Sequence, residues 1–515
     1  MNTTDPTDPL SWQPASRREW LGLAVLVLPT LLLALDMTVL HLAAPQLSAD
    51  LQPSSAELLW ILDIYGFMVA GFLIPMGTLG DRIGRRRLLL VGAFAFGLAS
   101  IGAAFATSSG MLIATRALLG VAGATLMPST LSLIRNMFHV PHERTLAITI
   151  WMTGFIVGTA LGPLIGGIVL EFFWWGAVFL LAVPVMALLL LAGPALLPEF
   201  RDEQAGRLDF PSALLCVSAL LLVIFGLKDV ARDGFNLVAI GAAVLGCVIA
   251  AAFVRRQRRL VDPMLDMALF RRRTFTVSVI AMLMSILALS GAWLMIFQYL
   301  QGVMGLSALA AGFVMLPSAV LQTIASLLVP RMSRWLQPSW FVSGGLSVAV
   351  AGFAVLVLLE SGNGIVVMVL GTTLLGVGIM PMMILGTDLV ISSVPPEKAG
   401  AAAATSETAT ELGMAMGIAV IGSVGAAVYR GHMAEQMPVG LDAQQVDIAT
   451  DTLGGALAVV AQLPPDIAEP LLAVVQSAFA EALHANVLIG GAIMAATAIL
   501  TAVCLREVRV NPGGH

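Results

Sequence analysis

Charged side chains are rare in the long apolar stretches of this sequence, and five of them stand out. Asp36, Asp63 and Arg116 lie in the first half of the chain, and Glu407 and Glu411 lie four residues apart in the second half. A charge in the middle of a bilayer costs about 2.5 to 3.5 kcal/mol on insertion scales, so such residues normally face a polar cavity and have a function. These five are the candidate functional residues.

The carboxylates among them suit the exchange of a proton for a cation. A desolvated carboxylate can be neutralised by a proton or by a cationic ligand, but not by both at once, and that exclusion is the basis of antiport. Asp36 is the leading candidate, with simple pairing to Arg116 as the alternative. Asp63 is expected at a similar depth and could line the same cavity, unless it lies at the membrane interface beside Trp60 and Tyr65.

Glu407 and Glu411 are spaced so that one helix face carries both carboxylates, one turn apart. Two carboxylates this close do not ionise independently, so they would titrate as a pair that shares one proton. This pattern favours a proton-coupling site or a site for a dication. The alternative is one functional glutamate and one that is hydrogen-bonded within its helix.

The composition places these residues in a membrane. Hydrophobic residues make up 58% of the 515 residues and charged residues only 11%, against about 25% charged in a typical soluble protein. Apolar runs of about 20 residues, long enough to cross a bilayer as a helix, recur along the chain. A soluble protein is excluded, and the three cysteines, which match no metal-ligand spacing, are expected to be packing residues.

Fourteen membrane spans are predicted, at 20–42, 58–79, 88–106, 111–134, 145–169, 172–196, 210–227, 235–254, 274–299, 306–329, 340–359, 364–391, 399–428 and 486–505. All but four of the 26 Lys and Arg residues then fall on one side, the side of both termini. Because basic loops stay in the cytoplasm, both termini are expected there, in a multi-pass protein of the bacterial inner membrane.

The resulting fold class is an all-α membrane protein divided by its two longest loops. The predicted parts are a cytoplasmic N-terminus (1–19), a six-helix bundle (20–196), two inserted helices (197–254), a cytoplasmic linker (255–273), a second six-helix bundle (274–505) and a cytoplasmic C-terminus (506–515). In the linker, residues 264–270 could form a short amphipathic helix. The external segment 429–485 is expected to cap the outer face, with an interfacial helix or hairpin at 465–483.

Glycines, one acid and several arginines crowd the loop after the second predicted span. Gly77 and Gly84 allow tight turns, while Arg82 and Arg85 hold the loop at the cytoplasmic face. Asp81 is placed to pair with an arginine or with a helix N-terminus, in a contact that could form in one conformational state and break in another. Topological anchoring alone explains the arginines but not the Asp and the glycines.

A glycine stripe runs along the fifth predicted span, with Gly154, Gly158, Gly162 and Gly166 at every fourth position and Pro163 and Gly167 beside it. Such stripes let helices approach closely. We expect the stripe to form a seam on which two halves of the protein rock.

Three of these segments together resemble the major facilitator superfamily. The Gly77 to Arg87 loop is similar to its signature loop between spans 2 and 3, Arg116 and the residues after it to its span 4 motif, and Gly158 to Gly167 to its span 5 antiporter motif. With fourteen spans and the Leu35 to Pro45 segment, the chain resembles the fourteen-helix drug/proton antiporters along its whole length.

The resemblance implies a proton-coupled multidrug exporter that works by alternating access on cationic or amphipathic compounds, such as quaternary ammonium antiseptics and dyes. It implies that Asp36, Asp63, Glu407 and Glu411 bind substrate and protons, that Arg116 takes part in proton coupling, and that the Asp81 loop gates the cytoplasmic side. Some family members carry another acid in span 10, which is absent at 306–329 here, so proton number and dication preference stay open. A monomer in the lipid bilayer is expected, without cofactor, metal or nucleic acid.

Other functions fit the sequence less well. An exporter dedicated to one metabolite or antibiotic would use the same carboxylates, and the sequence leaves it open. A proton-driven importer is disfavoured by the glycine stripe that ends in Gly166 and Gly167. An enzyme or a receptor is disfavoured because the chain has no HExxH, GxSxG, Walker or CxxC arrangement.

Overall fold

The structure is a computed structural model, and it describes residues 14–53, 55–201, 209–233, 236–260, 263, 265, 267–306, 308–359, 364–395 and 398–506. Within these ranges every regular element is a helix and no strand occurs. Twelve helices in the described part are long and apolar enough to cross a membrane. The expected all-α membrane architecture is confirmed, while the count of fourteen spans stays a prediction.

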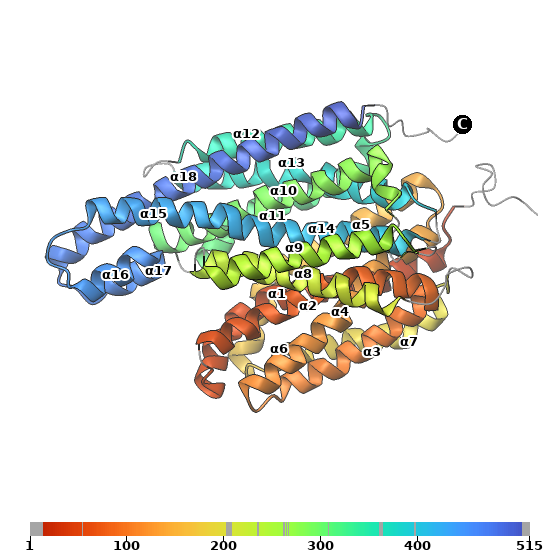
Figure 1. Cartoon of the computed structure of the whole chain (residues 1–515), viewed down its shortest axis with the longest axis horizontal. Coiled ribbons are helices and arrows are strands. Elements are labelled where there is room, and N and C mark those ends of the chain that lie inside the picture. Colours follow the sequence, from red (N-terminus) through yellow and green to blue (C-terminus); the bar gives the residue numbers. More distant parts are fainter. Residues whose placement is uncertain are drawn as a thin grey trace, which may run out of the picture.

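The first group of helices, coloured red to yellow in Figure 1, packs mainly through α1 on α5, α2 on α4 and α3 on α4. Its members are α1 (Arg17–Leu51), α2 (Ser55–Ile83), α3 (Arg85–Ala104), α4 (Ser109–Met137), α5 (Pro141–Phe172), α6 (Ala177–Leu180) and α7 (Ala182–Leu196). Two expected boundaries are wrong. α1 continues past residue 42 to Leu51, and the sixth span starts after residue 172, because α5 remains helical up to that point.

α8 (Phe210–Asp233) and α9 (Leu237–Gln257) pack on each other and lie between the two larger groups of helices in Figure 1. α8 also contacts α2 and α14 (Ala399–Met416). They occupy the places of the two predicted inserted helices. The division of the chain at 197–254 and 255–273 stays a prediction.

The linker after α9 does not form the expected amphipathic helix in its described residues. Only a single 3-10 turn, η2 (Leu269–Arg271), precedes α10, and residues 261, 262, 264 and 266 lie outside the described part. Three arginines in a row, Arg271 to Arg273, leave too short an apolar stretch for a longer helix.

The second large group of helices, green to blue in Figure 1, packs around α10, α13 and α18. Its members are α10 (Arg273–Gln298), η3 (Tyr299–Val303), α11 (Ala308–Met332), α12 (Pro338–Leu356), α13 (Gly364–Ser392), α14, η5 (Gly417–Ile421), α15 (Gly422–Gln436), α16 (Ala443–Asp451), α17 (Leu453–Val460) and α18 (Pro465–Cys504). α14, η5 and α15 follow one another without a break, so the thirteenth predicted span is helical and continues beyond residue 428.

The last helix overturns the expected layout of the external segment. Residues 465–483 form neither an interfacial helix nor a hairpin but the first half of α18, whose 40 residues are helical without interruption. At 1.5 Å per residue α18 is about 60 Å long, roughly twice the thickness of a hydrocarbon core. Together with α15, α16 and α17 it extends well past the ends of the other helices in Figure 1.

Candidate functional site

A buried ion pair joins two of the sequence-predicted residues in the first group of helices. Arg116 on α4 donates from Nη1 to Asp36 Oδ2 on α1 at 2.8 Å, and from Nε to the carbonyl oxygen of Ile61 on α2 at 3.1 Å. The Arg116 side chain is 2% exposed and that of Asp36 is 15% exposed. Asp36 is therefore the more exposed member of the pair.

Two aromatic rings hold the Arg116 guanidinium from its other sides. Its Cζ lies 5.0 Å from the ring centre of Tyr65 on α2 and 5.8 Å from that of Phe179 on α6. A desolvated guanidinium gains about 2 kcal/mol from such a ring. Arg116 thus keeps a backbone carbonyl and two rings as partners even when Asp36 is engaged elsewhere.

A very small cavity borders Asp36 on the side of α3 and α6. Its volume is about 10 Å³, and its lining includes Phe96 and Ser100 of α3 as well as Phe179. A space of this size holds at most one water molecule. The buried Ser100 hydroxyl in its wall has no hydrogen-bond partner among the described residues.

The glutamates of α14 approach the same region through Tyr65. Asp36, Arg116 and Glu411 all interact electrostatically with the Tyr65 hydroxyl, and Glu407 interacts with Glu411. That the two glutamates titrate as a pair stays a prediction. Acids from α1 and α14, on opposite halves of the chain, both act electrostatically on this phenol.

Asp63 is placed only in part. Its backbone belongs to α2, two residues after Ile61, whose carbonyl oxygen Arg116 binds, but its side chain lies outside the described part of the structure. The prediction that Asp63 lines the Asp36 cavity stays untested.

The segment around Asp81 is nearly all helix and not the expected loop. α2 runs to Ile83 and α3 starts at Arg85, so Gly84 alone makes the turn, with a φ of 111° that favours glycine. Asp81 accepts a hydrogen bond from Arg85 Nε at 2.8 Å and another from the backbone N–H of Ala401 at 3.1 Å. Asp81 was expected to pair with an arginine or with a helix N-terminus, and it makes both contacts, since Ala401 lies in the first turn of α14. Its role in gating stays a prediction.

A second set of contacts joins the two halves at the same side of the membrane. Arg144 on α5 donates from Nε to Asp388 Oδ1 on α13 at 2.8 Å, and Arg135 at the end of α4 donates to the carbonyl oxygens of Ile391 and Val394. Both contacts lie at the end of the helices where the basic residues gather. The two halves therefore touch each other at this end of the protein.

Comparison with known proteins assigns the fold that carries these contacts. A family model described as "Major Facilitator Superfamily" matches residues 26–418. The chain belongs to the major facilitator superfamily. Solved major facilitators share the fold, including the human organic anion transporter MFSD10 (TETRAN), with a TM-score of 0.59, 17% identity, and coverage of 94% of this chain and 100% of that one.

Within the superfamily, the curated relatives are multidrug efflux pumps and resistance proteins. The chain is 43% identical to the multidrug efflux pump LfrA of Mycolicibacterium smegmatis over 490 residues, which cover 95% of this chain and 97% of LfrA. It is 36% identical to the methyl viologen resistance protein SmvA of Salmonella typhimurium over 477 residues, 90% of this chain and 93% of SmvA. The resemblance expected from the motifs is confirmed, and the chain is a multi-pass membrane transporter.

The glycine stripe of this major facilitator packs differently from the expectation. A Cβ added at Gly154 would lie 2.5 Å from Val27, one at Gly166 would lie 2.8 Å from Val39, and one at Gly158 would collide with the Leu31 carbonyl. All three neighbours belong to α1, so the stripe seals two helices of one half and is not a seam between halves. Gly162 belongs to the same face, Gly167 is exposed, and the Pro163 side chain lies outside the described part.

Several residues of the site were not found from the sequence. The Ile61 carbonyl and the Phe179 ring hold Arg116, yet neither has a sequence signature, since a backbone oxygen is present at every residue. Tyr65 was noticed only as an aromatic. In the part of the chain that the structure describes, no cluster of three or more His, Cys, Asp or Glu residues could hold a metal ion.

Proposed function

We propose that this protein is a proton-coupled multidrug exporter of the bacterial inner membrane, with both termini in the cytoplasm. Its substrates would be cationic, amphipathic compounds such as quaternary ammonium antiseptics and dyes. Relatives named for multidrug efflux and for methyl viologen resistance support this proposal. Methyl viologen is itself a dication.

The observation that carries the proposal is the Asp36–Arg116 pair. Asp36 can give up Arg116 for a proton or for a cationic drug, because Arg116 retains the Ile61 carbonyl and the rings of Tyr65 and Phe179. Removing one partner of a buried ion pair normally costs about 3 to 5 kcal/mol. The extra partners of Arg116 lower that cost, so that Asp36 can alternate between the two ligands.

Alternating access then needs a closed and an open end. The contacts of Asp81 with Arg85 and of Asp388 with Arg144 hold the basic, cytoplasmic end closed in this conformation. Release of the drug outside and entry of a proton would occur in this state. Reopening of the cytoplasmic end would require both contacts to break.

An exporter dedicated to a single antibiotic is the second candidate. It is favoured by relatives such as the puromycin resistance protein pur8 of Streptomyces alboniger, 32% identical over 435 residues that cover 84% of this chain and 86% of pur8. A resistance profile separates the two functions. Protection against many unrelated cations supports multidrug export, and protection against one compound supports the dedicated exporter.

The test uses inverted membrane vesicles that contain the full chain and carry an acid-inside pH gradient. We expect wild-type vesicles to accumulate ethidium, accumulation to stop when an ionophore collapses the gradient, and Asp36→Asn to abolish it. The control is Asp447→Asn, which removes an exposed carboxylate of α16. Normal accumulation by Asp36→Asn, or accumulation that persists without the gradient, would contradict the proposal.

A further inference from the structure

A large cavity lies in the second half of the protein, apart from the carboxylates described above. Its volume is about 560 Å³, and its walls are α10, η3, η5, α15, α17 and α18. Cavities of this size hold drug-sized ligands. Neither Asp36 nor Glu407 nor Glu411 lines it.

Gly422 of α15, which has no side chain, leaves free space at one wall of the cavity. Ile418, Gly422, Gly425 and Tyr429 follow one another at three- and four-residue spacing, so they form one face of a continuous helix. A Cβ added at Gly422 would touch only Leu294 across the cavity, at 3.7 Å. A larger residue at 422 would therefore project into free space, which is unusual at a helix interface.

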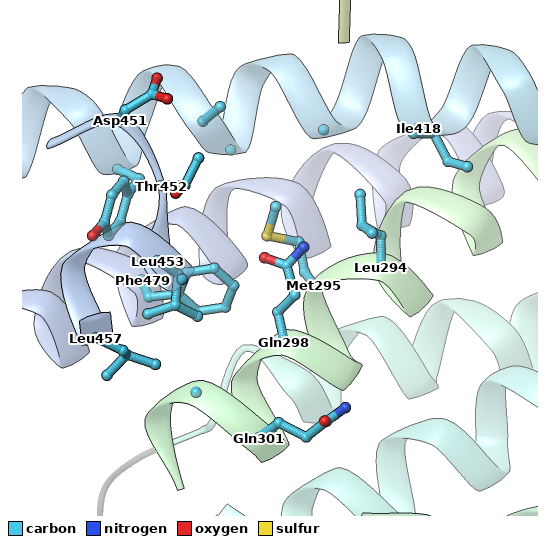
Figure 2. A pocket seen from close by; sticks show the side chains of 16 residues that line it. Leu294, Met295, Gln298, Gln301, Ile418, Asp451, Thr452, Leu453, Leu457 and Phe479 are labelled. Carbon is cyan, nitrogen blue, oxygen red and sulfur yellow. The ribbon is translucent and has the colours of Figure 1, made fainter. Parts of the chain in front are cut away.

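The two ends of the cavity differ in polarity. Figure 2 shows Leu294 and Ile418 at one end, Met295 and Gln298 in the middle, and Asp451 with Thr452 at the other end. Tyr429 and Phe479 add two rings, packed edge to face with centroids 6.3 Å apart. An elongated ligand with an apolar aromatic body and one charged or polar end fits this gradient.

The charge at the polar end favours a single positive charge on the ligand. Asp451 is the one carboxylate among the lining residues. Its present partner is Arg430 at 3.8 Å, and both side chains are well exposed, 45% for Arg430 and 70% for Asp451. Such an exposed pair is weak, so a bound cation could replace Arg430 at little cost.

The cavity also lies along the same continuous helix as the α14 glutamates. Ile418 follows Glu411 by seven residues, two helical turns on the same face, or about 10 Å along the axis. α17, which closes the cavity opposite α15, belongs to the external segment between α15 and α18. A substrate released from the membrane-embedded acids toward the outside meets this cavity next.

We propose that this cavity is a second binding site, on the exit side, for aromatic amphipathic monocations. The aromatic body lies along Met295, Gln298 and the Tyr429 ring, and the cationic end faces Asp451. This inference rests on the proposed export of such cations and adds to it a second binding site, separate from that of Asp36.

Photolabelling of the purified full-length protein in lipid nanodiscs with ethidium monoazide, followed by peptide mapping, tests the proposal. We expect labelled peptides from residues 294–301 and 418–429, and labelling that tetraphenylphosphonium suppresses but neutral triphenylphosphine oxide does not. Gly422→Trp fills the cavity and should reduce this labelling about tenfold, the loss expected when a ligand body is excluded from its pocket. Gly431→Trp, on the exposed side of the same helix, should leave it unchanged.

Two further variants keep the result unambiguous. Leu457→Trp fills the cavity from the opposite wall and replaces Gly422→Trp if that variant does not fold. Asp36→Asn should retain the label, which separates this site from the proposed transport site. Labelling that is absent from these peptides, or that survives both tryptophan variants, would overturn the second site, whereas failure of wild-type vesicles to accumulate ethidium would refute the export function.

Discussion

The Asp36–Arg116 pair combines deep burial with unequal access. Arg116 is almost fully enclosed, while Asp36 keeps some exposure. A buried guanidinium without a counter-ion is strongly unfavourable, whereas a buried pair of apolar residues in the same place is often tolerated. Stability and transport should therefore respond differently to changes in the two partners.

A double-mutant comparison at this pair follows from that difference. Asp36→Leu alone leaves the Arg116 charge buried and should lower the free energy of unfolding by about 3 to 5 kcal/mol. The two rings and the Ile61 carbonyl still stabilise the guanidinium, so the loss should lie toward the lower end of that range. Asp36→Leu combined with Arg116→Leu should recover most of that loss. Thermal unfolding of the detergent-solubilised protein, followed by tryptophan fluorescence, measures both.

Transport provides the control for that comparison. The double variant should be stable and yet transport no ethidium, since the exchangeable carboxylate is gone. A double variant that is less stable than Asp36→Leu would mean that Arg116 is not destabilising when unpaired.

The sequence predicted the charges of this site but not their arrangement. Asp36, Arg116, Glu407 and Glu411 were found because a charge within an apolar run is conspicuous. The pairing of Asp36 with Arg116 was one of two alternatives, because hydropathy gives the depth of a residue but not its direction around the helix. The side-chain position of Asp63 stays a prediction.

At the scale of helices, α2 and α14 approach each other closely enough to exclude side chains. A Cβ added at Gly77 would lie 2.5 Å from the Ala404 Cβ and 2.8 Å from the Gly400 carbonyl oxygen. This contact lies one turn from Asp81, at the end where the two halves touch. It therefore provides a steric test of the proposed gate.

Gly77→Val should wedge α2 away from α14 and favour an open cytoplasmic end. Spin labels at Ile83 and Ser392, in a chain whose three cysteines are replaced, report the separation of α2 and α13 by double electron–electron resonance. We expect the variant to populate longer distances. Gly66→Val, on the same helix with free space around it, is the matched control and should keep the wild-type distribution.

A second helix-scale contact clamps the start of α8 to the end of α9. Arg256 donates from Nε and Nη2 to the two oxygens of Asp209 at 2.7 and 2.9 Å, and the Ser212 hydroxyl donates to the same carboxylate. The bond from Arg256 is the main reason that the pKa of Asp209 is lowered to about 2. Bidentate pairs of this kind are among the stronger surface contacts.

Asp209→Asn should lower the thermal midpoint by about 1 to 3 °C through loss of this clamp. Because the folded pKa is depressed, the contribution is complete above the unfolded pKa of about 3.9 and disappears only as pH falls through the folded value. The difference between variant and wild type should therefore be constant from about pH 6 to about pH 8. A difference that changes over this range would contradict the assignment.

Hydropathy predicted most helices of this protein but not the arrangement of the segment from α15 to the first half of α18. The alternation of apolar and polar residues over 465–483 suggested a separate interfacial helix or hairpin, although polar residues such as Glu469, Gln476 and Glu481 are compatible with a continuous helix. The short helices α16 and α17 start at local capping signals instead. Asp442 and Gln445, for example, form the capping box that starts α16.

For the molecule as a whole, two carboxylates contribute contacts between the halves at the same end, Asp81 and Asp388. They involve different helices, α2 with α14 and α5 with α13, so their contributions should add. A hydrogen bond to a charged group contributes about 1.5 to 3 kcal/mol. Loss of either one should shift the balance of conformations roughly tenfold or more.

Asp388→Asn is thus expected to increase the open population measured with the same spin-label pair, and Asp388→Asn with Asp81→Asn to increase it further. Thr153 and Ser326, whose hydroxyls lie 3.0 Å apart between α5 and α11, offer a control at the same interface. Thr153→Val removes a neutral contact and should change the distribution much less. A double variant no more open than Asp388→Asn alone would show that the two contacts act as one.

The fold itself was recognisable because three short motifs occur in the right helices, and a family model then matched most of the chain. The arrangement of the halves was not predictable in the same way. The glycine stripe was expected between the halves and lies against α1, since the pattern shows that a helix packs closely but does not identify its partner.

The uninterrupted length of α18 gives the protein a long projecting arm at the end opposite to the Asp81 and Asp388 contacts. The tip formed with α15, α16 and α17 extends past the ends of the other helices, and α18 continues from it into the second half. Any rocking of that half must therefore sweep the tip through a larger arc than the membrane-embedded ends. An antibody fragment bound to this tip would therefore restrict the rocking motion and inhibit transport without entering the transport path.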